Sequence, residues 1–557
     1  MALLLAVYIW DVASLHPAIL FGAYHDDSLY FSTAKALSQG QGDVMPDFPG
    51  APPQTKYPVL YPWLLSWVWR AFPAFPQNVA AGIGLTIFFG CWSLSAAFQL
   101  LRRLGGVGNW PALLIVGICA LHPLFLTFSG RILSDLPFMA LALTALVLAD
   151  SKITRNGSMV APSLAGVIAG LSVGMRTMGL AVVAGICVAA LCRRALRQGM
   201  IFSVAAALVV VLGSWRQWMS LRAYPLWQAA FTPSLGWNQN LAYYTSYGAI
   251  WRVCVPNLRA FVALLKLTVP LLVLAPGRYL VTPLEEPPSM LQFAFALILT
   301  AAIVSGMIRQ ARSHGWKPIH FALPFYCVIV LAWPYPLMGR FLLPFLPLFL
   351  AGLWTELRRL AAMLRSSLRP AMPPSERCVA GVLAVLAVFL LLFAGWKILI
   401  KGRNELLSLA ADRGKALQEQ LQAYQWIREN TAPRDRIVAY EDPLLYLYTG
   451  REAARPATIS PAFVYLGRDQ GLAEDAAHMG DTAHSIGARF WMFTDSDFTM
   501  EGHTAVITNR LAEIESILPL VFHSNRDTVQ IYDSSCVTEP QSPRCLTIAP
   551  VLFPAKR

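Results

Sequence analysis

Charged residues are scarce in this sequence. Of its 557 residues only 13% are charged, whereas 56% are hydrophobic, and the mean hydropathy is +0.51. Disordered and collagen-like chains have a very different composition, and soluble globular proteins seldom reach this hydropathy. The composition therefore excludes the first two classes and favours a membrane protein.

Motifs that mark several other classes of protein are missing. The sequence has no P-loop, no His-Glu-x-x-His and no Gly-x-Ser-x-Gly placed between a strand and a helix. An ATP-driven pump and a metalloprotease therefore have no support. Seven of the nine cysteines are scattered in or beside apolar segments without metal-ligand spacing, which is typical of small core residues. Cys536 and Cys545 lie in the polar tail and are predicted to form a disulfide if that tail faces an oxidising compartment.

Acidic residues are few in the first 400 residues. This part holds 28 Lys and Arg against 11 Asp and Glu, a net charge of +17, whereas residues 401–557 hold 16 against 20, a net charge of −4. Basic blocks such as Arg193, Arg194 and Arg197 directly follow apolar stretches, where such residues determine membrane topology beside anionic lipid. We therefore expect no nucleic-acid binding, and we predict a membrane body, 1–400, followed by a polar domain, 401–557.

Long apolar stretches predict an α-helical protein that crosses the membrane several times. A span needs about 20 mostly apolar residues. The first candidate has no basic region and no small-residue cleavage site, so we expect a membrane helix, continuing to about Leu20 or starting upstream, rather than a cleaved signal peptide. Eleven candidates lie at 1–20, 79–101, 110–128, 132–149, 161–175, 177–192, 200–220, 289–308, 319–337, 341–357 and 378–399.

The distribution of basic residues predicts the orientation. If the apolar stretch 257–280 lies along the membrane surface, five loops on one side hold 15 of the 28 basic residues. Basic loops favour the cytoplasmic side. We therefore predict an internal N-terminus, external loops at 21–78 and 221–288, and an external tail.

The first external loop and the tail have their own secondary-structure signals. Two segments of the loop, SLYFSTAKALSQG and YPVLYPWLLSWVWRAF, are typical of helices lying at the lipid headgroups. In the tail an amphipathic run precedes strand-like and helix-like segments, RIVAY, EDPLLYLYTG, RFWMFTD and DTVQIYD. This alternation predicts a small extracytoplasmic α/β domain.

Three of the rare carboxylates are candidates for chemistry. Asp26 and Asp27 follow the outer end of the first span, and Asp135 lies one turn inside the fourth. With His25 beside it, the adjacent pair could accept a proton or bind a divalent cation, or simply begin a helix. A carboxylate within a span indicates a functional residue, because leaving it unpaired costs about 3 kcal/mol or more, although a local pair with Arg131 would also explain it.

Together these motifs resemble the GT-C superfamily of membrane glycosyltransferases, particularly the branch of protein O-mannosyltransferases and the aminoarabinose transferase that modifies lipid A. The similarity rests on the order of four motifs over about 400 residues. They are the acidic pair followed by Tyr30, a Lys-x-Pro motif (Lys56, Pro58), a Ser-acidic-x-Pro motif (Ser134, Asp135, Pro137) and an Arg-aromatic-x-x-Pro motif (Arg340, Phe341, Pro344). Leu29 and Thr55 depart from the aminoarabinose transferase, which has Arg and Glu there.

The resemblance implies a reaction class. In that family the donor is a sugar on a polyprenyl phosphate, the first acidic residue is the base, and basic residues hold the phosphate. It implies Asp26 as the base and Lys56 as a phosphate ligand, on the outer face of a bacterial inner membrane. The acceptor is then a lipid, a glycan or a protein, and membrane lipid surrounds the body.

The remaining charged residues complete the predicted site. Arg131, Arg176 and Arg340 are candidates to hold the donor phosphate, or alternatively to anchor helices at the headgroups. Asp27 and Asp135 are candidate catalytic residues and candidate ligands of a divalent cation. No other cofactor is expected.

Two other functions remain open. The first is a transporter or flippase of lipid-linked sugar, with Asp135 and Arg131 on its pathway, although transporters place such residues near the midplane and often repeat their halves. The second is a catalytically silent membrane anchor that presents the tail as a binding module. Loss of sugar transfer on mutation of Asp26 would separate the enzyme from both.

Overall fold

A computed structural model describes most of the chain. It covers residues 1–54, 56–150, 159–223, 254–255, 258, 290–332, 339–367, 374–457, 469–499 and 505–535. The predicted interfacial helix at 257–280 lies outside the described residues, apart from Leu258, and Cys536 and Cys545 also lie outside them. The described part is mostly helical, with one small sheet.

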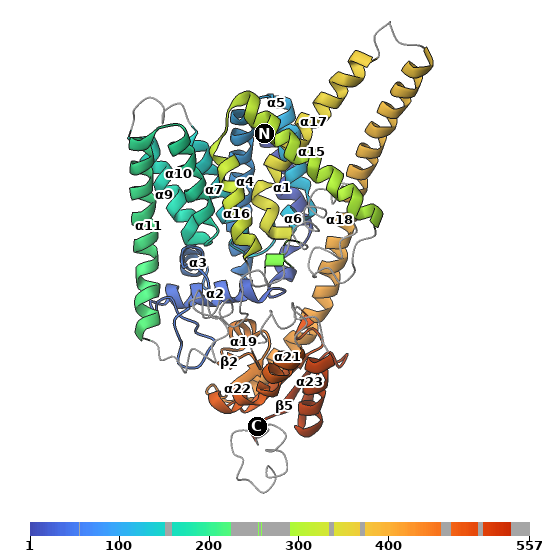
Figure 1. The fold of residues 1–557 in the computed structure, drawn as a ribbon. Helices are drawn as coiled ribbons and strands as arrows, with labels where there is room; N and C mark the ends of the chain where they lie inside the picture. Colours follow the sequence, from blue (N-terminus) through green and yellow to red (C-terminus); the bar gives the residue numbers. More distant parts are fainter. Residues whose placement is uncertain are drawn as a thin grey trace.

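Apolar helices form the upper body of the molecule in Figure 1. Each predicted span overlaps a helix. The helices are α1 (Ala2–Ser14), α4 (Val79–Leu104), α5 (Asn109–Leu121), α6 (Pro123–Ser129), α7 (Asp135–Ala149), α9 (Val160–Met175), α10 (Gly179–Cys192), α11 (Leu196–Ala223), α15 (Met290–His314), α16 (Pro318–Leu331), α17 (Leu346–Ser367) and α18 (Pro374–Asn430).

Three of the described helical segments are long and apolar enough to cross a membrane: Val79–Leu104, Leu196–Trp215 and Gly339–Met363. Helices α5 and α6 are together long and apolar enough for a fourth span, but they meet at a bend of 61°. Pro123 explains the bend, since its ring cannot continue α5, and the His122 side chain accepts a hydrogen bond from Leu124 N–H at 3.2 Å to begin α6. The number of eleven spans stays a prediction.

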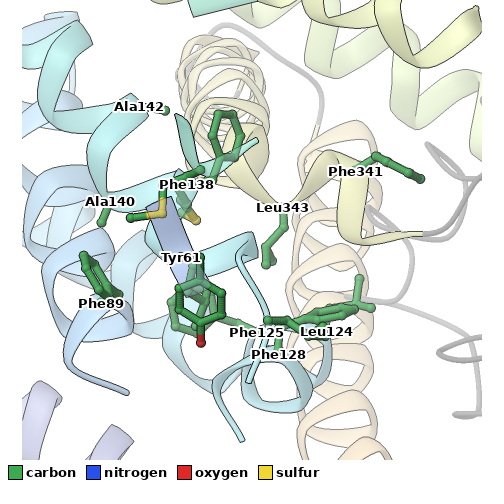
Figure 2. Packing of buried hydrophobic residues seen from close by; sticks show 14 of the residues in the cluster. Tyr61, Phe89, Leu124, Phe125, Phe128, Phe138, Ala140, Ala142, Phe341 and Leu343 are labelled. Carbon is green, nitrogen blue, oxygen red and sulfur yellow. The ribbon is translucent and has the colours of Figure 1, made fainter. Parts of the chain in front are cut away.

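The interior of the helical body is packed with aromatic and aliphatic side chains. Figure 2 shows Tyr61, Phe125, Phe128 and Phe138 within this core. Gly306 of α15 lets that helix approach α17 closely, since a Cβ there would overlap the carbonyl oxygen of Gly352. Polar side chains within this interior are hydrogen-bonded, as Ser93 is to the Leu136 carbonyl oxygen at 3.1 Å.

The C-terminal part is a five-stranded sheet with helices around it. The strand order is β2-β1-β3-β5-β4, in which β1 runs parallel to β2 and β3, while β5 is antiparallel to β3 and β4. The strands are β1 (Ile437–Ala439), β2 (Ala453–Ala454), β3 (Phe490–Thr494), β4 (Leu520–His523) and β5 (Val529–Asp533). The described helices here are α19 (Asp442–Thr449), α21 (Asp469–Ala477), α22 (Met479–Ile486) and α23 (Ala505–Ile517). Helix α18 runs from the helical body to this sheet (Figure 1).

Two helices of the first loop lie between the helical body and the sheet (Figure 1). They are α2 (His25–Ser38) and α3 (Leu60–Ala71), close to the two helices expected from the sequence. Helix α3 leaves Trp63 and Trp67 about half exposed, as expected for a helix at the lipid headgroups. The loop also shares a buried cluster with the C-terminal part, in which Leu29 and Met45 lie with Tyr440.

Candidate active site

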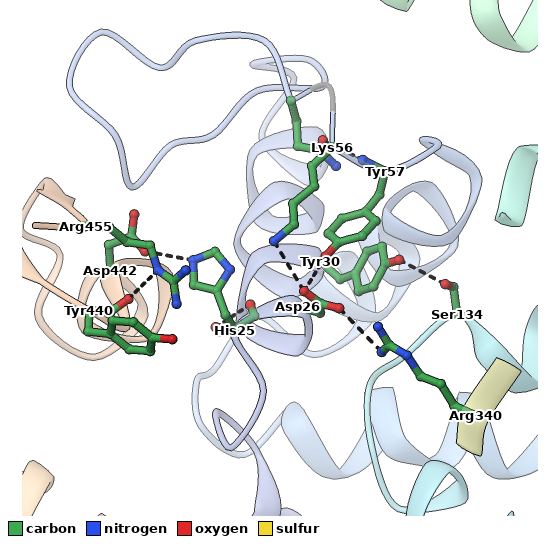
Figure 3. Close-up of polar contacts among 12 residues, drawn as sticks. His25, Asp26, Tyr30, Lys56, Tyr57, Ser134, Arg340, Tyr440, Asp442 and Arg455 are labelled. Carbon is green, nitrogen blue, oxygen red and sulfur yellow. Dashed lines mark hydrogen bonds and ion pairs between the residues drawn. The ribbon is translucent and has the colours of Figure 1, made fainter. Parts of the chain in front are cut away.

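The carboxylate of Asp26 is the centre of a charged cluster at the start of α2. Lys56 Nζ lies 3.4 Å from its Oδ1, and Arg340 Nη1 lies 3.6 Å from its Oδ2. The hydroxyl of Tyr57 donates a third contact (Figure 3). These partners come from the loop before α3 and from the 3₁₀ turn Gly339–Phe345, so residues more than 300 positions apart meet at one carboxylate.

The two cations keep Asp26 ionised. Burial by itself raises the pKa of this carboxyl, but the charges of Lys56 and Arg340, together with the Tyr57 hydrogen bond, outweigh burial and hold the pKa well below its usual range. The side chain of Asp26 is still 19% exposed, so it is accessible from outside the protein. The cluster therefore presents an ionised carboxylate beside two positive charges.

The neighbouring carboxylate, Asp27, is in a different environment. It is fully buried, and its Oδ1 accepts a hydrogen bond from Gly22 N–H at 3.0 Å. Its Oδ2 has no hydrogen-bond partner in the described part of the chain. Burial raises the pKa of Asp27 well above its usual range, although the charge of Arg131 opposes this. Asp27 thus faces inward, away from the exposed cluster.

Asp135 pairs with Arg176 rather than with Arg131. Its carboxylate lies 2.7 Å from Arg176 Nη1, at the start of α7 and the end of α9. The guanidinium of Arg131 lies instead over the ring of Tyr24, 4.3 Å from its centroid. The local pair considered from the sequence was therefore wrong, because the helix break between α6 and α7 turns Arg131 away from its neighbour four positions on.

Arg340 connects the two ion pairs electrostatically. Asp135 and Asp26 are the two carboxylates whose charges act most strongly on its guanidinium. The hydroxyls of Tyr30 and Ser134 lie 2.9 Å apart and link α2 to the start of α7 (Figure 3). The motif residues of the first loop, of α7 and of the 3₁₀ turn before α17 therefore lie together at one end of the helical body.

The donor set does not fit a divalent cation. Within the described residues, no three His, Cys, Asp or Glu side chains come together as a metal site would require. The two predicted ligands have other partners: Asp135 contacts Arg176, and Asp27 contacts the Gly22 amide. We therefore assign no step to a metal ion.

Two features of the cluster were missed in the sequence. Tyr57 directly follows Lys56, and its place inside the Lys-x-Pro motif could have drawn attention to it. The other is the contact of His25 with Asp442, in which His25 Nε2 lies 2.9 Å from Asp442 Oδ1. Asp442 is 417 positions away from His25, and no local pattern could have predicted that pair.

A separate cavity lies at the opposite end of α10 from Arg176. Its volume is about 550 Å³, and Arg193, His314, Trp316 and Lys317 line it. Arg193 and Lys317 both contact the carboxylate of Asp150, at 2.9 and 3.1 Å. The cavity is therefore distinct from the Asp26 cluster, and its cations are already paired.

Solved structures with a similar architecture cover nearly the whole chain. ArnT from Cupriavidus metallidurans bound to undecaprenyl phosphate aligns with a TM-score of 0.54 and 13% sequence identity, over 95% of this chain and 97% of that one. The apo state of the same protein gives a TM-score of 0.50 at 12% identity, over 92% and 94%. The chain has the GT-C fold.

The two ArnT structures confirm the resemblance seen in the sequence at the level of the fold. An Archaeoglobus fulgidus oligosaccharyltransferase tethered with an acceptor peptide aligns with a TM-score of 0.49 and 12% identity, over 94% of this chain and 74% of that one. No protein-family model matches the sequence, and neither does any curated protein.

Proposed function

We propose that the protein is an integral membrane glycosyltransferase that moves a sugar from a polyprenyl phosphate to an acceptor. The observation that carries this proposal is the cluster in which the ionised carboxylate of Asp26 lies between Lys56 and Arg340. Such a cluster combines a base with the positive charge that a departing phosphate requires. The GT-C fold, seen in a protein bound to undecaprenyl phosphate, supports this assignment.

In the proposed reaction each residue has one role. Asp26 takes the proton of the acceptor hydroxyl as that oxygen attacks the anomeric carbon. The bond from the anomeric carbon to the phosphate oxygen breaks, and the polyprenyl phosphate leaves with the electron pair. Lys56 and Arg340 stabilise the charge on the phosphate, while the carboxylate of Asp135, which is paired with Arg176, attracts Arg340.

The resting contacts of Asp26 suggest how donor binding prepares the base. Lys56 and Arg340 lower the pKa of Asp26 and so make it a weak base. A bound phosphate would compete for the same two cations. Since the carboxylate would then lose part of that stabilisation, its pKa would rise and it would become a stronger base once the donor is in place.

The proposal also includes the side of the membrane on which the reaction takes place. Eleven spans with an internal N-terminus would place the Asp26 cluster, Arg131 and the C-terminal α/β part, 401–557, on the outer face of a bacterial inner membrane. The acceptor would then be a lipid, a glycan or a protein outside the cytoplasm.

Purified protein in proteoliposomes tests the proposed function against a flippase of lipid-linked sugar. The assay supplies polyprenyl-phosphate sugars with a radiolabelled sugar and measures both the label on added acceptors and the leaflet that holds the lipid-linked label. We expect transfer to an acceptor without net movement of the intact donor between leaflets. Movement of the donor without any transfer would contradict the proposal.

A further inference from the structure

A buried contact connects the C-terminal part to the residue beside Asp26. His25 and Asp442 lie 2.9 Å apart, with side-chain exposures of 9% and 0%. Burial and the nearby charges of Arg455 and Lys56 lower the pKa of His25 well below its usual range, so the ring is neutral. His25 Nε2 and Asp442 Oδ1 therefore share a hydrogen bond between two buried side chains (Figure 3).

Three consecutive side chains at the start of α2 are held in three directions. Successive residues of a helix point about 100° apart. His25 contacts Asp442, Asp26 faces Lys56 and Arg340, and Asp27 is buried against Gly22. His25 and Asp27 therefore fix the first turn of α2 on both sides of Asp26.

The chain around Asp442 is held by packing and hydrogen bonds. It is the first residue of α19, which packs against α2. The Arg455 side chain stacks on the Tyr440 ring at 4.0 Å and donates to the Tyr440 carbonyl oxygen at 2.8 Å, which secures the chain just before α19. The backbone adds a further link, because Ala453 N–H donates to the Asp47 carbonyl oxygen at 2.7 Å.

From these contacts we infer that Asp442 is a positioning residue for the base: through His25, it holds Asp26 in the orientation that transfer requires. This inference rests on the proposed function. It also gives the C-terminal part a role in catalysis without any contact with substrate. Small displacements of a reacting group lower rates steeply, and about 1 Å can cost roughly 100-fold.

Substitutions at Asp442 test the hydrogen bond to His25. Asp442→Ala removes the hydrogen-bond partner of His25, and we expect the kcat of transfer to fall by about 10- to 100-fold. Asp442→Asn keeps an amide that can either accept from or donate to His25 Nε2, so it should recover most of that loss. Binding of undecaprenyl phosphate should change by less than about twofold in both variants, because Lys56 and Arg340 are intact.

A matched control tests whether any loosening of this interface has the same effect. Lys35 also lies on α2 and also contacts α19, because its Nζ is 4.7 Å from the centroid of the Tyr446 ring. It is about 14 Å along α2 from Asp26. Lys35→Met should retain kcat. His25→Ala should match Asp442→Ala, and the double variant should be no worse than either, since both remove one interaction.

Each outcome of this set decides the inference. Wild-type kcat in Asp442→Ala, or an equal loss in Lys35→Met, would overturn it while leaving the glycosyltransferase assignment in place. If Asp442→Ala does not fold, His25→Ala and Asp442→Asn answer the same question, and a loss in the first with recovery in the second supports it. Absence of transfer by the wild-type protein would overturn the proposed function, and this inference with it.

Discussion

Asp26 and Asp27 are chemically identical neighbours whose surroundings move their pKa values in opposite directions. The pKa of Asp26 is held well below its usual range by Lys56, Arg340 and Tyr57. Burial raises the pKa of Asp27 well above its usual range. The difference arises because α2 begins at the boundary between an exposed charged cluster and a closed interior. Of the two, only Asp26 is accessible enough to be the base in the proposed reaction.

The cations beside Asp26 should determine donor affinity. Lys56→Ala and Arg340→Ala are each expected to weaken binding of undecaprenyl phosphate, because a charge-assisted contact to phosphate contributes on the order of 1.5 to 3 kcal/mol, or roughly 10- to 100-fold in Kd. Isothermal titration in detergent measures this. Lys415→Ala, which removes an exposed lysine paired with Asp412, is the control and should bind as the wild type does. Unchanged affinity in both cluster variants would contradict this role.

Buried carboxyls in the C-terminal part should give stability a pH dependence. Burial raises the pKa of Asp497 to about 7, although two contacts from Thr494 oppose this shift. The folded protein therefore holds a proton that the unfolded chain has lost between about pH 4 and 7, so this group's contribution to stability falls as pH rises through that window, by up to about 1.4 kcal/mol per pH unit.

Asp497→Asn tests that contribution directly. The amide stays neutral and can still accept from Thr494 N–H, so the variant should lose less stability than the wild type as pH rises from 5 to 8. Thermal unfolding across this range measures the difference in stability between the two proteins. The lowered pKa of His25 gives stability the opposite pH dependence, but this contribution is the same in both proteins and cancels. Parallel curves for the two proteins would show that Asp497 does not titrate in this window.

At the scale of elements, the pair formed by Asp135 and Arg176 joins the start of α7 to the end of α9. Arg176→Leu leaves the carboxylate without its partner, and we expect a loss of about 3 kcal/mol in stability. The double variant Asp135→Asn/Arg176→Leu should recover much of that loss because no uncompensated charge remains. Thermal unfolding in detergent compares the two. A double variant less stable than the single one would show that the pair contributes through more than its charges.

The sequence predicted most helices but not how they join. Periodicity and apolar length located α2, α3 and the helices of the body, but several ends differ: α17 ends at Ser367 rather than at 357, and α15 at His314 rather than at 308. The sequence predicted a span at 378–399 and a separate amphipathic run. The structure has one helix there, α18, and no proline interrupts it between the two segments. Strand β2 was missed because two residues are too few for a period, and β4 because its side chains are mostly exposed.

The candidate site could be predicted in part for similar reasons. Motif order and the positive-inside rule indicated that Asp26, Lys56 and Arg340 belong on one side of the membrane. Their mutual contact, and the replacement of Arg131 by Arg176 as partner of Asp135, depend on how the helices pack. Such long-range choices leave no periodic pattern in the sequence.

At the scale of the whole molecule, the basic loops predict which way the protein faces. With an internal N-terminus and eleven spans, the sheet and the Asp26 cluster lie outside the cytoplasm. A reporter that is active only in the cytoplasm, fused after Arg557, should be silent, while a periplasmic reporter at the same position should be active. Cytoplasmic activity there would contradict the span count and the sidedness of the site together.

The role of Asp26 as the base is the central claim, and single-turnover transfer in proteoliposomes tests it most directly. The assay compares the wild type with Asp26→Asn, and with Asp43→Asn as a control from the same loop. We expect Asp26→Asn to slow transfer from a polyprenyl-phosphate sugar by roughly 100-fold or more, with undecaprenyl phosphate binding retained, while Asp43→Asn stays active. Transfer at the wild-type rate by Asp26→Asn would contradict the account.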